Sequence, residues 1–231
     1  MTTATEILEA LGAILGASIA RFGIAMVVGL ALVVPALLIA LARKAWADRR
    51  ARDEKADGLA YRRGAWYAPN HTWLATRGPG ELKVGLDDLA RRILPSATAV
   101  ELPRPGLRFR RGDPIAVVSA GKHTVHVAAP VDGTVVDVNS RVKRDPALVR
   151  RDPYGGGWLF SIAPVDAEYV KLPQGNEAVS WLRSEKVRLT RFVEDELGFA
   201  AADGGEAPPA APATLGEEGW RKVVFSFLHA T

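Results

Sequence analysis

The stretch "AVVSAGKHTVHVAAPVDG", residues 116–133, sets one lysine beside a glycine between two strand-like runs. The run before Gly121 and the run after Lys122 are short and rich in valine, which is typical of β-strands. A glycine beside the lysine favours a tight hairpin turn that exposes Lys122. Two interpretations stay open: a solvated turn lysine, or the attachment point for a swinging cofactor arm.

Short runs rich in valine, isoleucine or aromatics continue on both sides of this hairpin, separated by proline and glycine. Residues 85–94 have apolar positions at helical spacing, with acids early and arginines late. A second helix is expected over 177–197. We therefore predict that residues 66–197 form a mainly β domain, a small sandwich or barrel with a short inserted helix and a C-terminal helix. Strands are expected at 99–103, 113–120, 123–130, 133–139 and 157–164.

Five longer runs follow one another in this domain: YAPNHTWL (67–74), VGLDDLARRIL (84–94), VELPRPGLRFRRGDPIAVV (100–118), APVDGTVVDVN (129–139) and DPALVRRDPYGGGWLFSI (145–162). Together they resemble the H protein of the glycine cleavage system, a member of the lipoyl/biotinyl-carrier hammerhead group. A single run would be weak evidence, but five in the family's order are strong. The resemblance implies a lipoyl-type fold in which a lysine at a hairpin tip carries lipoate.

The same resemblance implies that Lys122 is the lysine that receives lipoate through an amide bond. Aligning Val117-Val118 and Ala129-Pro130 with the family's paired valines and its Ala-Pro brings Lys122 to that position without a gap. The family's hairpin reads Glu-Ser-Val-Lys-Ala, whereas Ser119 stands here in place of the glutamate and Ala120-Gly121 in place of Ser-Val. The expected cofactor is therefore either none or lipoate on Lys122.

The sequence shows no other catalytic or metal-binding motif beyond what its amino-acid composition would give by chance. Cysteine is absent, which excludes disulfides, thiolate metal sites and a cysteine nucleophile. His123 and His126 are three apart on an expected strand and should face opposite sides, so no shared metal site is expected. His71 is expected to be buried rather than catalytic, and Trp158 to fill the core. Basic residues are scattered among acids, so no nucleic-acid partner is predicted. The sequence has no GxSxG, P-loop, HExxH or paired-carboxylate motif that stands out, so no enzyme active site is predicted.

An uncharged run, FGIAMVVGLALVVPALLIALA, extends from Phe22 to Ala42. At ~1.5 Å per residue such a helix spans about 31 Å, close to the ~30 Å hydrocarbon core of a bilayer. The run is too long for a signal peptide, and no Ala-x-Ala-like cleavage site follows it. A retained, single-pass transmembrane helix is predicted for 22–42. Lysine and arginine crowd the segment after it, which predicts an outside N-terminus and a cytoplasmic domain at the inner membrane.

Residues 1–21 carry Gly12, Gly16 and Ala20 at four-residue spacing. Small residues at this spacing allow two helices to approach closely in lipid, so they are candidate contacts with another subunit. A short amphipathic segment on the outer surface is the other interpretation. Residues 43–65 are expected to be a charged connector that continues the helix and frays near Gly58.

Residues 198–219 are rich in alanine, proline and glycine and predict a linker. Beyond it, residues 220–231 hold the aromatic side chains Trp220, Phe225 and Phe227. Exposed aromatics at a free tail would promote aggregation. This apolar segment is therefore interpreted as a docking tail for a partner or for the domain's own sheet edge, with a frayed terminus as the alternative.

Three functions are compatible with these features. The favoured one is a non-catalytic, membrane-anchored subunit that uses its H-like domain as a scaffold module among other subunits of a membrane complex. The alternative is a carrier lipoylated at Lys122 that delivers equivalents to a membrane-associated enzyme. The ordinary shuttle of glycine cleavage is the least expected, because a bilayer anchor would restrict visits to soluble partners.

Overall fold

The structure is a computed structural model of the 231-residue chain. It describes residues 54–56, 58–94, 97–121, 123–197 and 215–228, and in the N-terminal part 3, 9, 11, 26, 31, 33–39 and 41. The chain divides into two units, Met1–Arg49 and Arg50–Thr231, and each is considered by itself.

In the first unit, residues 33–39 are helical and exposed. Within the part of the chain that the structure describes, no helix has both the length and the apolar character needed to cross a membrane. Most of residues 22–42 lie outside the described residues, so the predicted span stays a prediction. Gly12, Gly16 and Ala20 also lie outside them.

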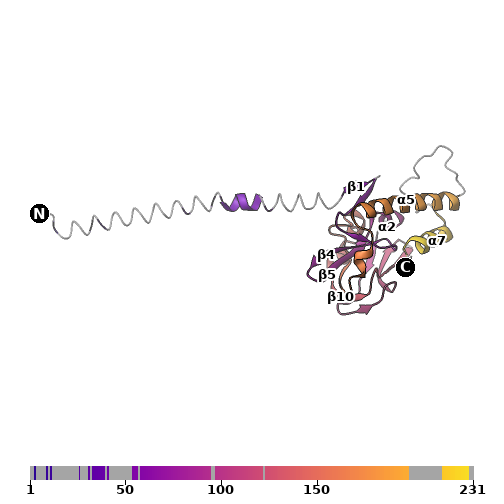
Figure 1. Ribbon diagram of the computed structural model, residues 1–231, viewed down its shortest axis with the longest axis horizontal. Coiled ribbons are helices and arrows are strands. Elements are labelled where there is room, and N and C mark those ends of the chain that lie inside the picture. Colours follow the sequence, from indigo (N-terminus) through magenta and orange to yellow (C-terminus); the bar gives the residue numbers. More distant parts are fainter. Residues whose placement is uncertain are drawn as a thin grey trace. The chain divides into compact units, whose positions relative to one another are not determined.

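The second unit is built mainly from antiparallel strands, which confirms the predicted mainly β class (Figure 1). One sheet has the strand order β3-β4-β5-β11-β10-β7, and a smaller one has the order β6-β8-β9. The larger sheet comprises β3 (Trp66–Tyr67), β4 (Thr72–Gly78), β5 (Glu81–Leu86), β11 (Phe160–Pro164), β10 (Gly133–Val138) and β7 (Arg108–Phe109). The smaller sheet comprises β6 (Ala99–Glu101), β8 (Pro114–Ala120) and β9 (His123–Ala128).

Both predicted helices are present, and the structure has further helices that were not predicted. Helix α2 (Asp88–Ile93) lies within the helix expected at 85–94, and α5 (Gly175–Leu197) includes the one expected at 177–197. Asp87 begins α2, because its carboxylate accepts hydrogen bonds from the backbone N–H groups of Leu89 and Ala90, both at 2.9 Å. The remaining helices are α3 (Ser140–Arg144), α4 (Leu148–Arg151), the 3-10 helix η1 (Glu168–Lys171) and α7 (Glu217–Leu228).

The last part of the connector, residues 43–65, does not form the helix predicted for it. Instead of a continued helix, β1 (Glu54–Ala56) and β2 (Leu59–Tyr61) form an antiparallel hairpin. Gly58 lies in the turn with φ +78°, a left-handed conformation that glycine adopts at little cost. The chain reverses direction here because this glycine permits a tight turn between the two short strands.

Trp158 was predicted to fill the core, but it packs against the core from its edge and is only partly buried. Its side chain is half-buried, with the Arg77 guanidinium 5.3 Å and the Lys83 ammonium 4.9 Å from the ring centroid. Tyr154, four residues earlier, is fully buried, and its hydroxyl donates to the carbonyl of Ala60 at 2.9 Å. The cationic side chains stabilise the partly exposed ring of Trp158 through cation–π contacts.

Helix α7 packs against β9, an edge strand of the smaller sheet, and also contacts α2 and α5 (Figure 1). Exposed edge strands promote association with other chains, and a covering helix prevents it. The tail therefore lies on its own domain as a helix beside the edge and does not add a strand. Its buried face comprises Trp220, Val223, Val224, Phe227 and Leu228.

Trp73 of β4 lies across from Gly85 of β5 and is fully buried. Its indole N–H donates to the carbonyl of Leu86 at 3.0 Å, which fixes the ring over the glycine. A Cβ atom at position 85 would lie 2.8 Å from atoms of this ring. Glycine is therefore required at position 85 to make room for the indole.

We expect Gly85→Ala to lower the free energy of unfolding by about 1–3 kcal/mol, because the added methyl overpacks the core. Gly78→Ala is the matched control, since position 78 is also in a strand and a Cβ there meets nothing within 4 Å. The control should change stability by less than about 0.5 kcal/mol. Urea unfolding of the purified chain measures both, and equal stabilities would contradict the packing described.

Candidate functional site

The hairpin around Lys122 is formed by β8 and β9, which pair from Pro114–Ala128 to Ala120–His123. Positions 121 and 122 therefore connect the strands as a two-residue loop. Gly121 has φ +63°, as the first central position of a type I′ or II′ turn requires. Lys122 itself lies outside the described residues, but Gly121 and Thr124 are exposed. The two ends of the hairpin tip thus reach solvent.

Helix α7 lies directly beside this tip. The ring of His123 stacks on the ring of Trp220, with centroids 4.0 Å apart and planes inclined by 25°. His126 is exposed farther along β9. Among the described residues, no three His, Cys, Asp or Glu side chains gather as metal ligands would. At the start of β9, His123 therefore contacts an aromatic side chain of the tail.

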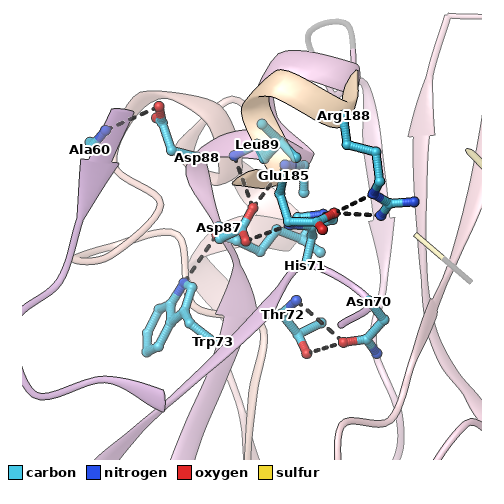
Figure 2. A network of polar contacts seen from close by, with 12 residues as sticks. Ala60, Asn70, His71, Thr72, Trp73, Asp87, Asp88, Leu89, Glu185 and Arg188 are labelled. Carbon is cyan, nitrogen blue, oxygen red and sulfur yellow. Dashed lines mark hydrogen bonds and ion pairs between the residues drawn. The ribbon is translucent and has the colours of Figure 1, made fainter. Parts of the chain in front are cut away.

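His71 is fully buried, in the turn between β3 and β4 and not in a strand (Figure 2). Its φ is +55°, a left-handed conformation that is uncommon outside glycine. Nδ1 lies 2.8 Å from a carboxylate oxygen of Asp87, and Nε2 lies 3.4 Å from a carboxylate oxygen of Glu185 on α5. The imidazole therefore joins the cap of α2 to α5.

Aromatic rings and one arginine complete this cluster. The rings of Trp181 and Phe227 stack on His71 at centroid distances of 5.1 and 6.1 Å. Arg188 donates from Nε to Glu185 at 2.9 Å, and its guanidinium lies 4.0 Å from the centroid of Phe227. The cluster thus reaches α7 as well as α5, and pairs two basic with two acidic side chains.

The cluster changes the pKa values of its members. Burial disfavours the imidazolium, but the charges of Asp87 and Glu185 and the hydrogen bond to Asp87 outweigh it and raise the pKa of His71 to about 9. Burial likewise disfavours ionised Glu185, but His71 and Arg188 outweigh it and lower the pKa of this carboxyl group. His71 is therefore protonated at neutral pH, and its full burial suits a structural role.

The His71 turn is also connected to the lysine hairpin. Asn70 donates from its side-chain amide to the carbonyl of Ala128, at the end of β9, at 2.8 Å. Its amide oxygen accepts from the hydroxyl of Thr72 at 2.7 Å (Figure 2). The strand that leaves the hairpin tip is thus held at its far end by the turn that contains His71.

The tail residues predicted to contact a partner lie in two different environments. Trp220 and Phe227 are buried against the domain itself, whereas Phe225 is 74% exposed. The spacing of 220, 223, 224 and 227 puts one apolar stripe on the domain-facing side of α7, and Phe225 falls on the opposite side. Contact between Phe225 and a partner stays a prediction.

Two contacts of the site, between His71 and Glu185 and between His123 and Trp220, were not predicted from the sequence. Glu185 lies far from His71 along the chain, and nothing local to either residue indicates that they meet. The stacking of Trp220 on His123 depends on where α7 packs, which the sequence of the tail does not specify. The one available signal was the apolar spacing in 220–228, which favours an amphipathic helix.

We expect the free energy of unfolding to fall by about 3 kcal/mol between pH 6.5 and pH 9 because of His71. Its folded-state pKa of about 9 lies above the ordinary value of 6.5, so its stabilising contribution is complete below pH 6.5 and lost as pH rises through 9. His71→Asn removes the charge with a residue that tolerates left-handed φ. The difference in the free energy of unfolding between His71→Asn and the unmodified chain should therefore shrink from pH 6.5 to pH 9.

Urea unfolding at several pH values measures this difference. His126→Asn is the matched control, because His126 is exposed on β9. It should leave the pH dependence of the unmodified chain in place. A difference between His71→Asn and the unmodified chain that stays constant from pH 6.5 to 9 would contradict a protonated His71.

Comparison with known proteins shows which family the sequence of this domain resembles. The family model described as glycine cleavage H-protein matches residues 65–185. "Probable glycine cleavage system H protein 2" of Sulfurisphaera tokodaii is 36% identical over 128 residues, covering 53% of this chain and 86% of that protein. The glycine cleavage system H protein of Pseudoalteromonas atlantica is 41% identical over 105 residues, covering 46% of this chain and 81% of that protein.

A solved structure is also similar. The crystal structure of a glycine cleavage system H protein from Mycobacterium marinum aligns with a TM-score of 0.42 and 30% sequence identity, covering 47% of this chain and 94% of that chain. The family match includes both strands of the lysine hairpin and the turn that contains His71. The chain belongs to the glycine cleavage H-protein family.

Proposed function

We propose that this chain is a membrane-tethered carrier of the H-protein type, with lipoate attached to Lys122. The observation that supports this most is the hairpin itself. Pairing of β8 with β9 extends to Ala120 and His123, and Gly121 adopts the left-handed φ of a tight turn. The family match at residues 65–185 includes position 122. A lysine in such a loop suits covalent modification.

The residues around position 122 fit a lipoyl group. Gly121 and Thr124 are exposed, so a modifying enzyme can approach the tip from both ends of the loop. The paired strands hold the base of the arm rigidly, and the long lysine stem lets its end reach more than one partner while limiting the volume searched. When attached, the dithiolane of lipoate supplies a reversible two-electron disulfide that can carry reducing equivalents or a bound group.

The membrane tether is the second part of the proposal. It is supported by the uncharged run 22–42 and by the basic residues that follow it, which favour a cytoplasmic H-like domain. Gly12, Gly16 and Ala20 would then let another membrane subunit pack closely against the chain. A tethered carrier of this kind would serve a membrane-associated enzyme rather than soluble partners.

A second candidate function is a scaffold subunit without lipoate. Two observations favour it. The first is that α7, which lies beyond the family match, packs Trp220 onto His123, the residue that follows Lys122. Ser119 also stands in place of the glutamate in the family's hairpin. Both features alter what a lipoyl-transferring enzyme would meet at the tip.

Intact mass spectrometry of the chain from its native host separates the two functions. A carrier should show the mass increment of one lipoyl group, and Lys122→Arg should abolish it while leaving the chain folded. An unmodified mass in cells that lipoylate other proteins would exclude the carrier and favour the scaffold.

The same preparation tests the tether. We expect the chain to stay in the membrane fraction after an alkaline wash and to require detergent for release. Recovery of the full-length chain in the soluble fraction would contradict the tether whether or not Lys122 is modified.

A further inference from the structure

Arginine side chains without an acidic partner gather along β7, the strand at one end of the larger sheet. Four exposed arginines lie on this strand and on the turns that flank it: Arg104, Arg108, Arg110 and Arg111. None of them forms an ion pair in the part of the chain that the structure describes. By contrast, Arg77 of β4 binds Asp137 of β10 at 2.8 Å. We call the four unpaired residues the arginine edge.

The backbone around β7 directs these side chains to solvent. The N–H of Leu107 donates to the carbonyl of Arg104 at 3.1 Å and closes a tight turn before the strand. Successive residues of an extended segment point to opposite sides. Arg108 and Arg110 therefore share one side, whereas Phe109 between them is buried in the core.

Two aspartates lie beside the arginine edge, but their carboxylates bind backbone groups. Asp113 accepts a hydrogen bond from the backbone N–H of Arg110, and Asp132 accepts one from the backbone N–H of Arg111, both at 2.7 Å. Four positive and two negative side chains leave a net charge of +2 at this place. The edge is thus a cationic surface whose charge is not balanced by the described residues around it.

A shallow hollow of about 580 Å³ opens at this edge. Arg108 and Arg110 line it, together with Val165, which directly follows β11. Val165 is 73% exposed and Leu107 is 45% exposed, so apolar side chains reach solvent beside the guanidinium groups. A guanidinium pairs well with the oxygens of a phosphate group. Cationic and apolar side chains together suit the boundary between lipid headgroups and acyl chains.

The bilayer is the anionic surface that the chain would keep nearest to this edge. Eleven residues, 43–53, join the predicted span at 22–42 to β1, and at ~3.6 Å per residue they reach at most about 40 Å. A tether this short raises the effective concentration of lipid headgroups around the domain. An acidic protein would have to be recruited separately, so lipid is the favoured occupant.

We propose that the arginine edge binds the headgroups of anionic lipids on the cytoplasmic surface of the membrane. Arg108 and Arg110 pair with lipid phosphate in the hollow, and Leu107 and Val165 contact the outer ends of the acyl chains. This inference rests on the proposed membrane tether. It adds that the domain lies against the bilayer through β7 and does not move freely at the end of its connector.

Because the sequence contains no cysteine, Leu107→Cys places a single fluorescent label on the edge. The labelled full-length chain carries Lys122→Arg, so that no lipoyl thiol competes for the label. It is reconstituted in vesicles of phosphatidylglycerol and phosphatidylcholine that contain a lipid with a nitroxide headgroup, which quenches a label in contact with it. We expect strong quenching in these vesicles and weak quenching in vesicles of phosphatidylcholine alone. Arg108→Gln and Arg110→Gln should each lower the ratio of quenched to unquenched label about fivefold.

The matched charge control combines Arg191→Gln with Arg221→Gln, which removes two exposed arginines from α5 and α7. Figure 1 shows these helices well away from β10, the strand that pairs with β7. This variant should leave the quenching at position 107 unchanged. A label at Val187→Cys on α5, where the side chain is 48% exposed, should show little quenching in either kind of vesicle.

The outcomes separate this inference from the tether on which it rests. Release of the chain from the vesicles by an alkaline wash would overturn the tether. Retention of the chain with no quenching at position 107, or with equal quenching in the two kinds of vesicle, would overturn the lipid-binding edge and leave the tether intact. The arginines would then be assigned to an acidic protein partner.

Discussion

A buried contact of 2.8 Å between His71 and Asp87 organises the domain around it. Removing two such groups from water is costly unless they are paired and hydrogen-bonded, and loss of one partner leaves an uncompensated polar group in the core. Asp87 uses its other carboxylate oxygen to begin α2. His71 has a second acidic neighbour in Glu185, which fixes the position of α5. One imidazole thus determines how a turn and two helices meet.

The lysine hairpin depends on this cluster at both ends of β9. Asn70, next to His71, binds the carbonyl of Ala128 at the end of the strand. At the start of the strand His123 stacks on Trp220, and the helix that carries Trp220 also packs Phe227 on His71. The site around position 122 is therefore supported by contacts that originate in the buried cluster, although none of these residues need take part in chemistry.

Much of this architecture could be predicted from local patterns. The strands on either side of Gly121 were predictable because short valine-rich runs that meet at a glycine favour a β-hairpin, and α5 was predictable from its helical spacing. The hairpin at 54–61 was not, because Gly58 within a charged segment is equally compatible with a fraying helix and with a turn. The partial exposure of Trp158 was not predictable, because hydrophobicity alone does not reveal that Arg77 and Lys83 cover one side of its ring.

The contacts that were missed join segments far apart in the chain. Neither the pairing of His71 with Glu185 nor the packing of Trp220 on His123 leaves a local signature, since both depend on how helices pack on the finished sheets. The most direct test of the central cluster is an NMR titration that follows the imidazole resonances of His71, assigned by comparison with His71→Asn. A pKa of about 9 is expected for the folded chain. A value at or below the ordinary 6.5 would contradict a protonated His71 held between two carboxylates.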